Sequence, residues 1–251
     1  MKLLLAGDFH GNHRHAQKTA NMARRLGMDA VVQLGDFGFT WDGPQRLGGL
    51  NNIFAQFEMP LYWIDGNHEN FDVMEDMGAF TDADHMVKMG SHVTYIPRGY
   101  VWEWDGVSFL AMGGAYSIDK EWREPGKSWW PQELITDADV ERAYENLGPN
   151  GVDVMLTHDA PELPEKLREY MYDPYNEYGD YKTDRSSTDN RIRLAQVMEA
   201  AKPQLYVHGH MHHRYSDTMG DTHIEGLDRD TTGDSSWAVI HTDDIKSKER
   251  V

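Results

Sequence analysis

The stretch "KLLLAGDFHG" at residues 2–11 sets a pattern that the rest of the chain repeats. A short apolar run ends at Gly7, and Asp8 and His10 follow directly after it. A continuous apolar run of this length is typical of a strand buried on both faces, and glycine allows a tight turn at its end. The sequence therefore predicts a central strand that brings a carboxylate and an imidazole to the turn after it.

Strand-like runs that end in turn residues recur along the chain. They are "DAVVQLGD" (29–36), "PLYWIDGNHE" (60–69), "VDVMLTHDAP" (152–161) and "PQLYVHGHMHH" (203–213). Helical patterns lie between them, at residues 16–26, 43–57, 135–148 and 187–202. Strands that alternate with helices predict a parallel sheet with right-handed crossovers, so the expected fold class is α/β.

The middle of the chain has a different pattern. Residues 92–116 alternate β-branched and aromatic residues, and the dipeptide "DG" at 105–106 is a hairpin signal, so we expect an antiparallel meander here. Residues 162–186 are rich in Tyr, Asp, Pro and Gly and indicate a long loop that could form a lid. No repeat or linker divides the chain, so we expect a single domain over residues 1–251.

One helix carries clear end signals. Thr136 is the expected N-cap of the helix at 135–148, Asp139 stands three residues later as its capping partner, and Gly148 is the expected C-cap.

Composition limits the function classes. The formal charge of −18 makes the chain a poor electrostatic match for duplex nucleic acid or an anionic membrane. There is no cysteine, so disulfides, thiolate zinc sites and cysteine nucleophiles are excluded, and any metal site must use His, Asp, Glu or Asn. The apolar run at the N-terminus is shorter than a signal segment, and no run approaches the roughly 20 residues of a membrane span. We expect a cytoplasmic protein.

Polar side chains follow five of the predicted strands. They are Asp8 and His10, then Asp36, then Asn67 and His68, then His158, and finally His210 with His212. Because the carboxyl ends of parallel strands converge, we expect these side chains to meet at one edge of the fold. Each short motif alone is common as a capping Asp or a simple turn. All five together, each at a strand end, indicate a metal site.

The series "GDFHG" (7–11), "GD" (35–36), "GNHE" (66–69), "TH" (157–158) and "GHMH" (209–212) resembles the signature of calcineurin-like metallophosphoesterases, in particular bacterial and phage phosphodiesterase members. The resemblance implies a four-layer α/β/β/α sandwich with mixed sheets and a site for two metal ions. The implied ligands are Asp8, His10 and His212 for the first ion, Asn67, His158 and His210 for the second, and Asp36 bridging both.

The resemblance also implies an activity. Two divalent ions clamp a phosphate and generate a bridging hydroxide that attacks phosphorus in line. We expect Mn²⁺, with Fe, Zn, Ni or Co as alternatives. The implied role of His68 is to protonate the leaving oxygen or to stabilise the phosphorane-like charge, with a packing role behind the ligands as the alternative. The expected substrate is a small phosphodiester or nucleotide, such as a cyclic nucleotide.

The sequence departs from the protein phosphatases of this family at the positions that grip phosphate. In those enzymes the "GD" motif continues with an Asp-Arg pair, in which Asp supports the catalytic His and Arg grips phosphate, but here Phe39 and Thr40 stand at these positions. An Arg is also absent after "GNHE", where Asn70 stands. A phosphomonoester, with nearly two negative charges, gains most from an Arg clamp, so a diesterase is favoured. Asp42 is a candidate to support His68. A phosphomonoesterase, a nuclease and a non-catalytic scaffold stay open as alternatives.

Three further residues are candidates to line the substrate pocket. Arg14 and His213 stand next to motif residues, and Arg123 lies in the segment 113–133, which is dense in Trp, Tyr, Arg and Lys. Its aromatic residues could stack on a nucleobase or simply pack the segment onto the sandwich. In "VHGHMHH", His208 belongs to the strand end and is expected to be buried rather than to bind metal.

Overall fold

The first strand buries side chains on both of its faces. In β1 (Lys2–Ala6), Leu3 and Leu5 lie in the interior between two sheets, whereas Leu4 and Ala6 pack under the helices outside the first sheet. Successive side chains of a strand point to opposite faces, so a strand between two apolar layers must be apolar throughout. This arrangement explains the continuous apolar runs of the sequence. The computed structural model describes residues 1–41, 43–81, 84–162, 164–173 and 185–246.

The first sheet has six strands in the order β12-β1-β2-β3-β5-β4. Its other strands are β2 (Ala30–Leu34), β3 (Leu61–Ile64), β4 (Val87–Lys88), β5 (Val93–Tyr95) and β12 (Trp237–His241). The four central strands are parallel, and β12 and β4 lie antiparallel at the two edges.

The second sheet repeats this plan in the order β10-β11-β9-β8-β7-β6. Its strands are β6 (Val101–Trp104), β7 (Val107–Met112), β8 (Val154–Thr157), β9 (Leu205–His208), β10 (Tyr215–Met219) and β11 (Thr222–Gly226). The strands β11, β9, β8 and β7 are parallel, again between antiparallel edge strands.

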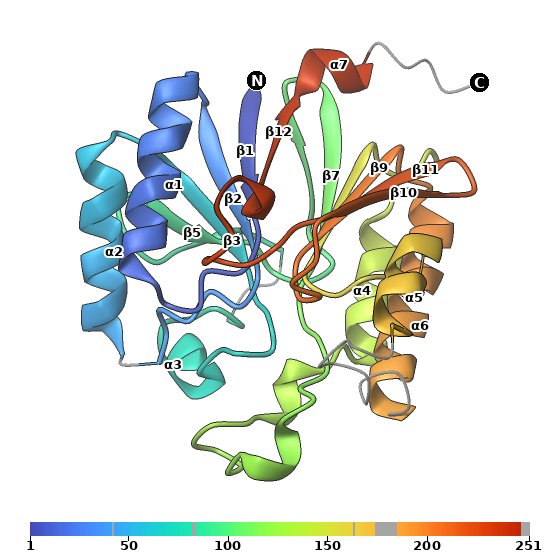
Figure 1. The fold of residues 1–251 in the computed structure, drawn as a ribbon, viewed down its shortest axis with the longest axis horizontal. Helices are drawn as coiled ribbons and strands as arrows, with labels where there is room; N and C mark the ends of the chain where they lie inside the picture. Colours follow the sequence, from blue (N-terminus) through green and yellow to red (C-terminus); the bar gives the residue numbers. More distant parts are fainter. Residues whose placement is uncertain (42, 82–83, 163, 174–184, 247–251) are drawn as a thin grey trace.

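Helices cover the outer face of each sheet (Figure 1). The first sheet carries α1 (His13–Leu26), α2 (Pro44–Gln56) and α3 (Phe71–Asp76), and the second carries α4 (Asp137–Asn146), α5 (Glu165–Met171) and α6 (Arg185–Ala201). A short α7 (Thr242–Lys246) follows β12, and 3-10 turns form at η1 (Lys120–Trp122), η2 (Pro131–Glu133) and η4 (Gly233–Ser236). The predicted α/β/β/α sandwich with mixed sheets is confirmed.

Two local expectations were wrong. Residues 92–116 do not form one meander, because β5 pairs in parallel with β3 in the first sheet and only β6 and β7 form a hairpin in the second. Alternation of residues along a strand predicts burial of its faces and says nothing about which sheet it joins. The segment 162–186 contains the helix α5, and residues 174–184 of the predicted lid lie outside the described residues.

The N-cap of α4 is confirmed. The side chain of Thr136 accepts from the amide of Asp139, and the Asp139 carboxylate accepts from the amide of Thr136. The helix ends one residue earlier than expected, with Leu147 rather than Gly148 as the C-cap.

A buried ion pair fixes the crossing from the first sheet to the second. Arg98 lies between β5 and β6, and its Nε donates to Oδ2 of Asp65 at 2.9 Å, directly after β3. The guanidinium also donates to the carbonyls of Leu134 and Gln132, so the same residue holds the segment that leads to α4 in place. The Asp65 carboxylate is fully buried and accepts a second bond from Tyr95.

Among the described residues, no helix is long and apolar enough to cross a membrane. The cellular location of the protein stays a prediction.

We expect Arg98→Ala to lower the free energy of unfolding by about 3–5 kcal/mol, because it leaves the Asp65 carboxylate buried without its cation. Arg142→Ala is the matched control, since Arg142 is one-third exposed and its loss should cost at most about 1 kcal/mol. Denaturant unfolding of the chelator-treated protein measures both. Equal losses in the two variants would contradict a structural role for the buried pair.

Candidate metal centre

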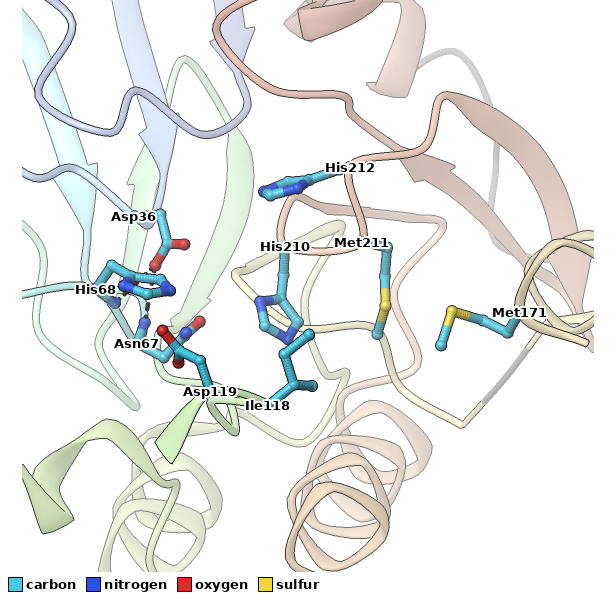
Figure 2. A pocket seen from close by; sticks show the side chains of 9 residues that line it. All are labelled: Asp36, Asn67, His68, Ile118, Asp119, Met171, His210, Met211 and His212. Atoms are coloured by element: carbon cyan, nitrogen blue, oxygen red, sulfur yellow. Dashed lines mark hydrogen bonds between the residues drawn. The ribbon is translucent and has the colours of Figure 1, made fainter. Parts of the chain in front are cut away.

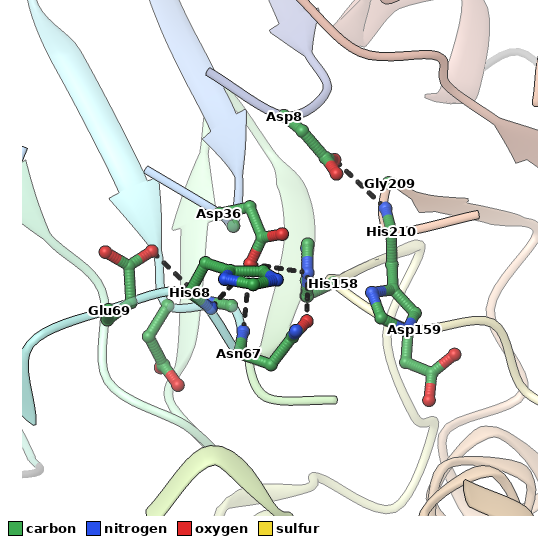
Figure 3. A network of polar contacts seen from close by, with 12 residues as sticks. Asp8, Asp36, Asn67, His68, Glu69, His158, Asp159, Gly209 and His210 are labelled. Atoms are coloured by element: carbon green, nitrogen blue, oxygen red, sulfur yellow. Dashed lines mark hydrogen bonds and ion pairs between the residues drawn. The ribbon is translucent and has the colours of Figure 1, made fainter. Parts of the chain in front are cut away.

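The structure gathers the predicted donors between the two sheets, at the carboxyl ends of five parallel strands. These strands and the donors that follow them are β1 with Asp8 and His10, β2 with Asp36, β3 with Asn67, β8 with His158, and β9 with His210 and His212. Figure 3 shows several of these side chains pointing toward a common centre.

The donors form two groups that share one carboxylate. Ligand atoms of Asp8, His10, Asp36 and His212 all lie within 4.8 Å of one another, and those of Asp36, His158 and His210 do the same. The amide oxygen of Asn67 lies 3.1 Å from His158 Nε2, beside the second group. This is the division that the sequence resemblance implied, with Asp36 between two positions. Binding of ions there stays a prediction.

The backbone is strained at four of these donors. His10, Asp36, His210 and His212 have φ angles of 45°, 49°, 63° and 47°, in the left-handed region. They are four of only seven described non-glycine residues with positive φ. Such conformations cost free energy and persist where the surroundings impose them, typically at functional sites.

Two glycines are required by close approach. A Cβ on Gly35 would overlap the imidazole of His158, and one on Gly209 would overlap the carboxylate of Asp8. In each case the backbone of one loop touches a donor from another loop, so the glycines let the two sheets bring their donors together.

Asp36 is held firmly although it is buried. Its Oδ1 accepts from the amides of Asn67 at 3.0 Å and His68 at 2.8 Å. Burial alone would raise the pKa of Asp36, but the charges of His158 and His68 hold it well below its usual value. Burial would also raise the pKa of Asp8, but the hydrogen bond from His212 outweighs it and lowers this pKa to about 2. Both carboxylates are therefore ionised in the interior.

The donor set around His158 suits a cation as well as a proton. Its Nδ1 lies 2.7 Å from the carbonyl oxygen of Leu34, which can only accept, so Nδ1 carries the hydrogen. Nε2 then faces oxygens of Asp36 and Asn67, both at 3.1 Å. Three electron-pair donors converge, and only a proton or a cation can lie between them. Burial lowers the pKa of His158, but Asp36 raises it to about 9. Nitrogen and oxygen donors of this kind suit a divalent transition metal.

His10 has a carboxylate partner that the sequence analysis missed. Its Nδ1 donates to Asp230 at 3.2 Å, and Asp230 is also held by the side-chain amide of Asn12 at 2.6 Å. Burial lowers the pKa of His10, whereas the hydrogen bond to Asp230 raises it to about 11. A carboxylate behind a ligand histidine fixes its tautomer and orientation. Asp230 follows β11, in a tail that the sequence pattern resolved only as strand fragments.

A second set of buried bonds orients Asn67. Its Nδ2 donates to Ser117 at 2.9 Å, which turns its carbonyl oxygen toward His158. Ser117 in turn donates to Glu133 and accepts from Arg123 at 2.7 Å. The Arg123 guanidinium pairs with Glu133 at 2.9 Å and is only 8 % exposed. The expectation that Arg123 touches phosphate therefore finds no support in this geometry; Arg123 supports a donor instead.

The positions of the missing Asp-Arg pair are filled by buried residues. Phe39 and Thr40 are both fully buried, and Thr40 donates to Glu69 at 3.2 Å. Glu69 also accepts from the amide of Phe37 at 2.6 Å, so it links the loop after β2 to the loop after β3. Burial raises the pKa of Glu69 to about 8. Asn70 caps α3 by accepting from the amide of Val73. The sequence analysis missed the role of Glu69, although it stands inside "GNHE".

The remaining candidate residues have different surroundings. His208 is buried and its Nε2 lies 2.6 Å from the hydroxyl of Tyr215, which fits the expected structural role. His213 stacks on Tyr170 with ring centres 3.9 Å apart. Arg14 is exposed on the first turn of α1, and Asp42 lies outside the described residues.

A pocket of about 210 Å³ opens onto the donors. Figure 2 shows His68 and Asn67 on one side of it and His210 with Met211 on the other. The described residues that line it are Asp36, Asn67, His68, Ile118, Asp119, Met171, His210, Met211 and His212.

The two-sheet α/β sandwich, with nitrogen and oxygen donors gathered between the sheets, is the type of fold and site found in phosphoesterases. A sequence model of the calcineurin-like phosphoesterases matches residues 1–214, and the chain belongs to this family. The family consists of metal-dependent phosphoester hydrolases, so hydrolysis of a phosphoester is the class of reaction. No curated protein matches the sequence.

Solved structures share the fold at low sequence identity. The protein TT1561 of Thermus thermophilus is 12% identical, with 96% of this chain and 98% of that chain covered and a TM-score of 0.58. A dimetal phosphatase from Danio rerio is 10% identical, with 95% and 91% covered and a TM-score of 0.58. A phosphopantetheinyl hydrolase from Mycobacterium tuberculosis is 16% identical, with 95% and 96% covered and a TM-score of 0.51.

We expect Asp230→Ala to weaken binding at the ion position of His10 by about 10- to 100-fold, because the imidazole loses the partner that orients it. Calorimetric titration of Mn²⁺ into the chelator-treated protein measures this. Asp234→Ala, an exposed change four residues away, is the control and should bind as the unchanged protein does. If the two variants bind Mn²⁺ equally well, Asp230 does not position His10.

Proposed function

We propose that the protein is a metal-dependent phosphodiesterase that hydrolyses small diesters, with cyclic nucleotides among the candidate substrates. Two divalent ions, Mn²⁺ first among them, would be held by Asp8, His10 and His212 on one side and Asn67, His158 and His210 on the other, with Asp36 shared. When bound, they supply positive charge for the phosphate and acidify water.

The choice of a diester rests on one observation: no cationic side chain of Lys or Arg lines the described part of the pocket. None of its nine described lining residues is Lys or Arg. Phe39 and Thr40 stand at the positions of the family's Asp-Arg pair, whose Arg would bind a monoester, and both are buried. A monoester near neutral pH has nearly one more negative charge than a diester and loses more when no guanidinium faces it.

The protein's own groups have distinct tasks in this proposal. Asp36 fixes the loop of His68 through its backbone amide, and Trp41 Nε1 donates to the carbonyl of His68 at 2.8 Å. The His68 ring lies at the pocket, where it can donate a proton to the leaving oxygen. Burial lowers the pKa of His68, and the negative charge of Asp36 opposes this effect.

The choice between diester and monoester is tested with two aryl substrates. We expect kcat/KM for bis(p-nitrophenyl) phosphate to exceed that for p-nitrophenyl phosphate by at least about tenfold with Mn²⁺, because no charged hydrogen bond compensates the additional charge of the monoester. Release of p-nitrophenolate measures both. A higher value for the monoester would favour a phosphomonoesterase and overturn the proposal.

The role of His68 is tested by His68→Ala. We expect kcat to fall about 100-fold or more, the range of a lost general acid, while bound Mn²⁺ stays near two ions per chain. Metal analysis and turnover are measured on the same sample, with His223→Ala, a partly exposed histidine on β11, as the control. Loss of the metal together with activity would show that His68 supports the ions rather than the leaving group.

A further inference from the structure

The pocket beside the donors has an apolar wall built from three different segments. Ile118 stands in the loop between β7 and η1, lines the pocket and is 44 % exposed, so its side chain is accessible to a ligand. Met171 ends α5, and Met211 lies between the donors His210 and His212. Figure 2 shows Ile118, Met171 and Met211 facing the space next to the imidazole of His210.

The charged residue of this wall is acidic. Asp119 lines the pocket and its side chain is 40 % exposed. The nearby guanidinium of Arg123 lies 3.5 Å from Asp119 but is buried and paired with Glu133. A ligand in the pocket therefore meets the carboxylate of Asp119, not an exposed cation.

The size of the pocket suits a ring. An apolar cavity of about 150 Å³ is enough to hold benzene. The whole pocket, including the part next to the donors, has about 210 Å³, so its apolar part suits one ring at most. Methionine side chains are flexible and adapt to varied apolar shapes, so Met171 and Met211 would accommodate different substituents.

We propose that this pocket binds an organic substituent of the phosphodiester, and that Ile118 and Asp119 make it select an uncharged, largely apolar group over an anionic one. The inference rests on the proposed function and narrows it. It favours a diester with one negative charge and an aromatic or aliphatic substituent, and it disfavours substrates with a second phosphate or a carboxylate on that substituent.

Non-hydrolysable phosphinates test the selection without turnover. Dimethylphosphinate and diphenylphosphinate both carry one negative charge, and their dissociation constants are measured by calorimetry on the Mn²⁺-loaded protein. We expect diphenylphosphinate to bind about tenfold more tightly, the discrimination that an apolar pocket supplies. A carboxylate in the para position of one ring should weaken binding about threefold, the effect of a partly screened like charge.

Variants assign the two effects to their residues. Ile118→Ala should reduce the preference for phenyl over methyl at least threefold, with Ile118→Val giving a smaller reduction, and Asp119→Asn should remove the carboxylate penalty. Trp122→Ala, on the same segment but 86 % exposed and outside the pocket, is the control and should change neither ratio. Melting temperatures of the variants establish that they are folded.

The outcomes separate the two proposals. If neither phosphinate binds and no aryl diester is hydrolysed, the proposed function fails and this inference fails with it. If diesters are hydrolysed but the two phosphinates bind equally, or Ile118→Ala behaves as Trp122→Ala does, the proposed function stands and the pocket does not select apolar substituents.

Discussion

The buried carboxylate of Asp36 is the point where the two sheets become one site. It follows β2 of the first sheet, accepts from backbone amides of the loop after β3, and lies 3.1 Å from His158, which follows β8 of the second sheet. An ionised carboxylate is stable in the interior only when hydrogen bonds and positive charge compensate the loss of water. The loops around Asp36 therefore cannot move independently, and both groups of donors depend on its position.

The carboxyl ends of all eight parallel strands among the described residues contribute to this centre. Five deliver donors directly. Two of the others deliver supports for donors: Ser117 after β7 holds Asn67, and Asp230 after β11 holds His10. Arg98 after β5 pairs with Asp65, which precedes the loop of Asn67. The architecture thus places donors and their hydrogen-bond partners at the same edge, which is why strain in four donor residues can be sustained.

The sequence was sufficient for the fold class and for bringing the candidate donors to one edge, because both follow from local order: an apolar run, a glycine, then a polar side chain. Metal binding by these donors stays a prediction. The sequence was insufficient for hydrogen-bond partners that lie far apart in the chain. Asp230 lies 220 residues from His10, and nothing near it marks the contact. Arg123 is a second example, because its ion pair with Glu133 and its bond to Ser117 are not marked in the sequence, and its contact with phosphate stays a prediction. Likewise, residues 92–116 alternate correctly for strands but are divided between two sheets.

In the proposed site, the positive charge that binds phosphate would come from metal ions and not from Lys or Arg side chains. The seven donors include only two carboxylates, Asp8 and Asp36, so two divalent ions would leave about two positive charges in the shell. The chain as a whole carries −18, and the nearest wall of the pocket adds Asp119 rather than a Lys or Arg. A phosphate is then attracted only at short range, where it meets the ions directly, and each additional anionic group on the substrate is repelled by its surroundings. In the proposed reaction, selectivity for a singly charged phosphate would come from the position of the positive charge together with the carboxylate of Asp119 in the pocket wall.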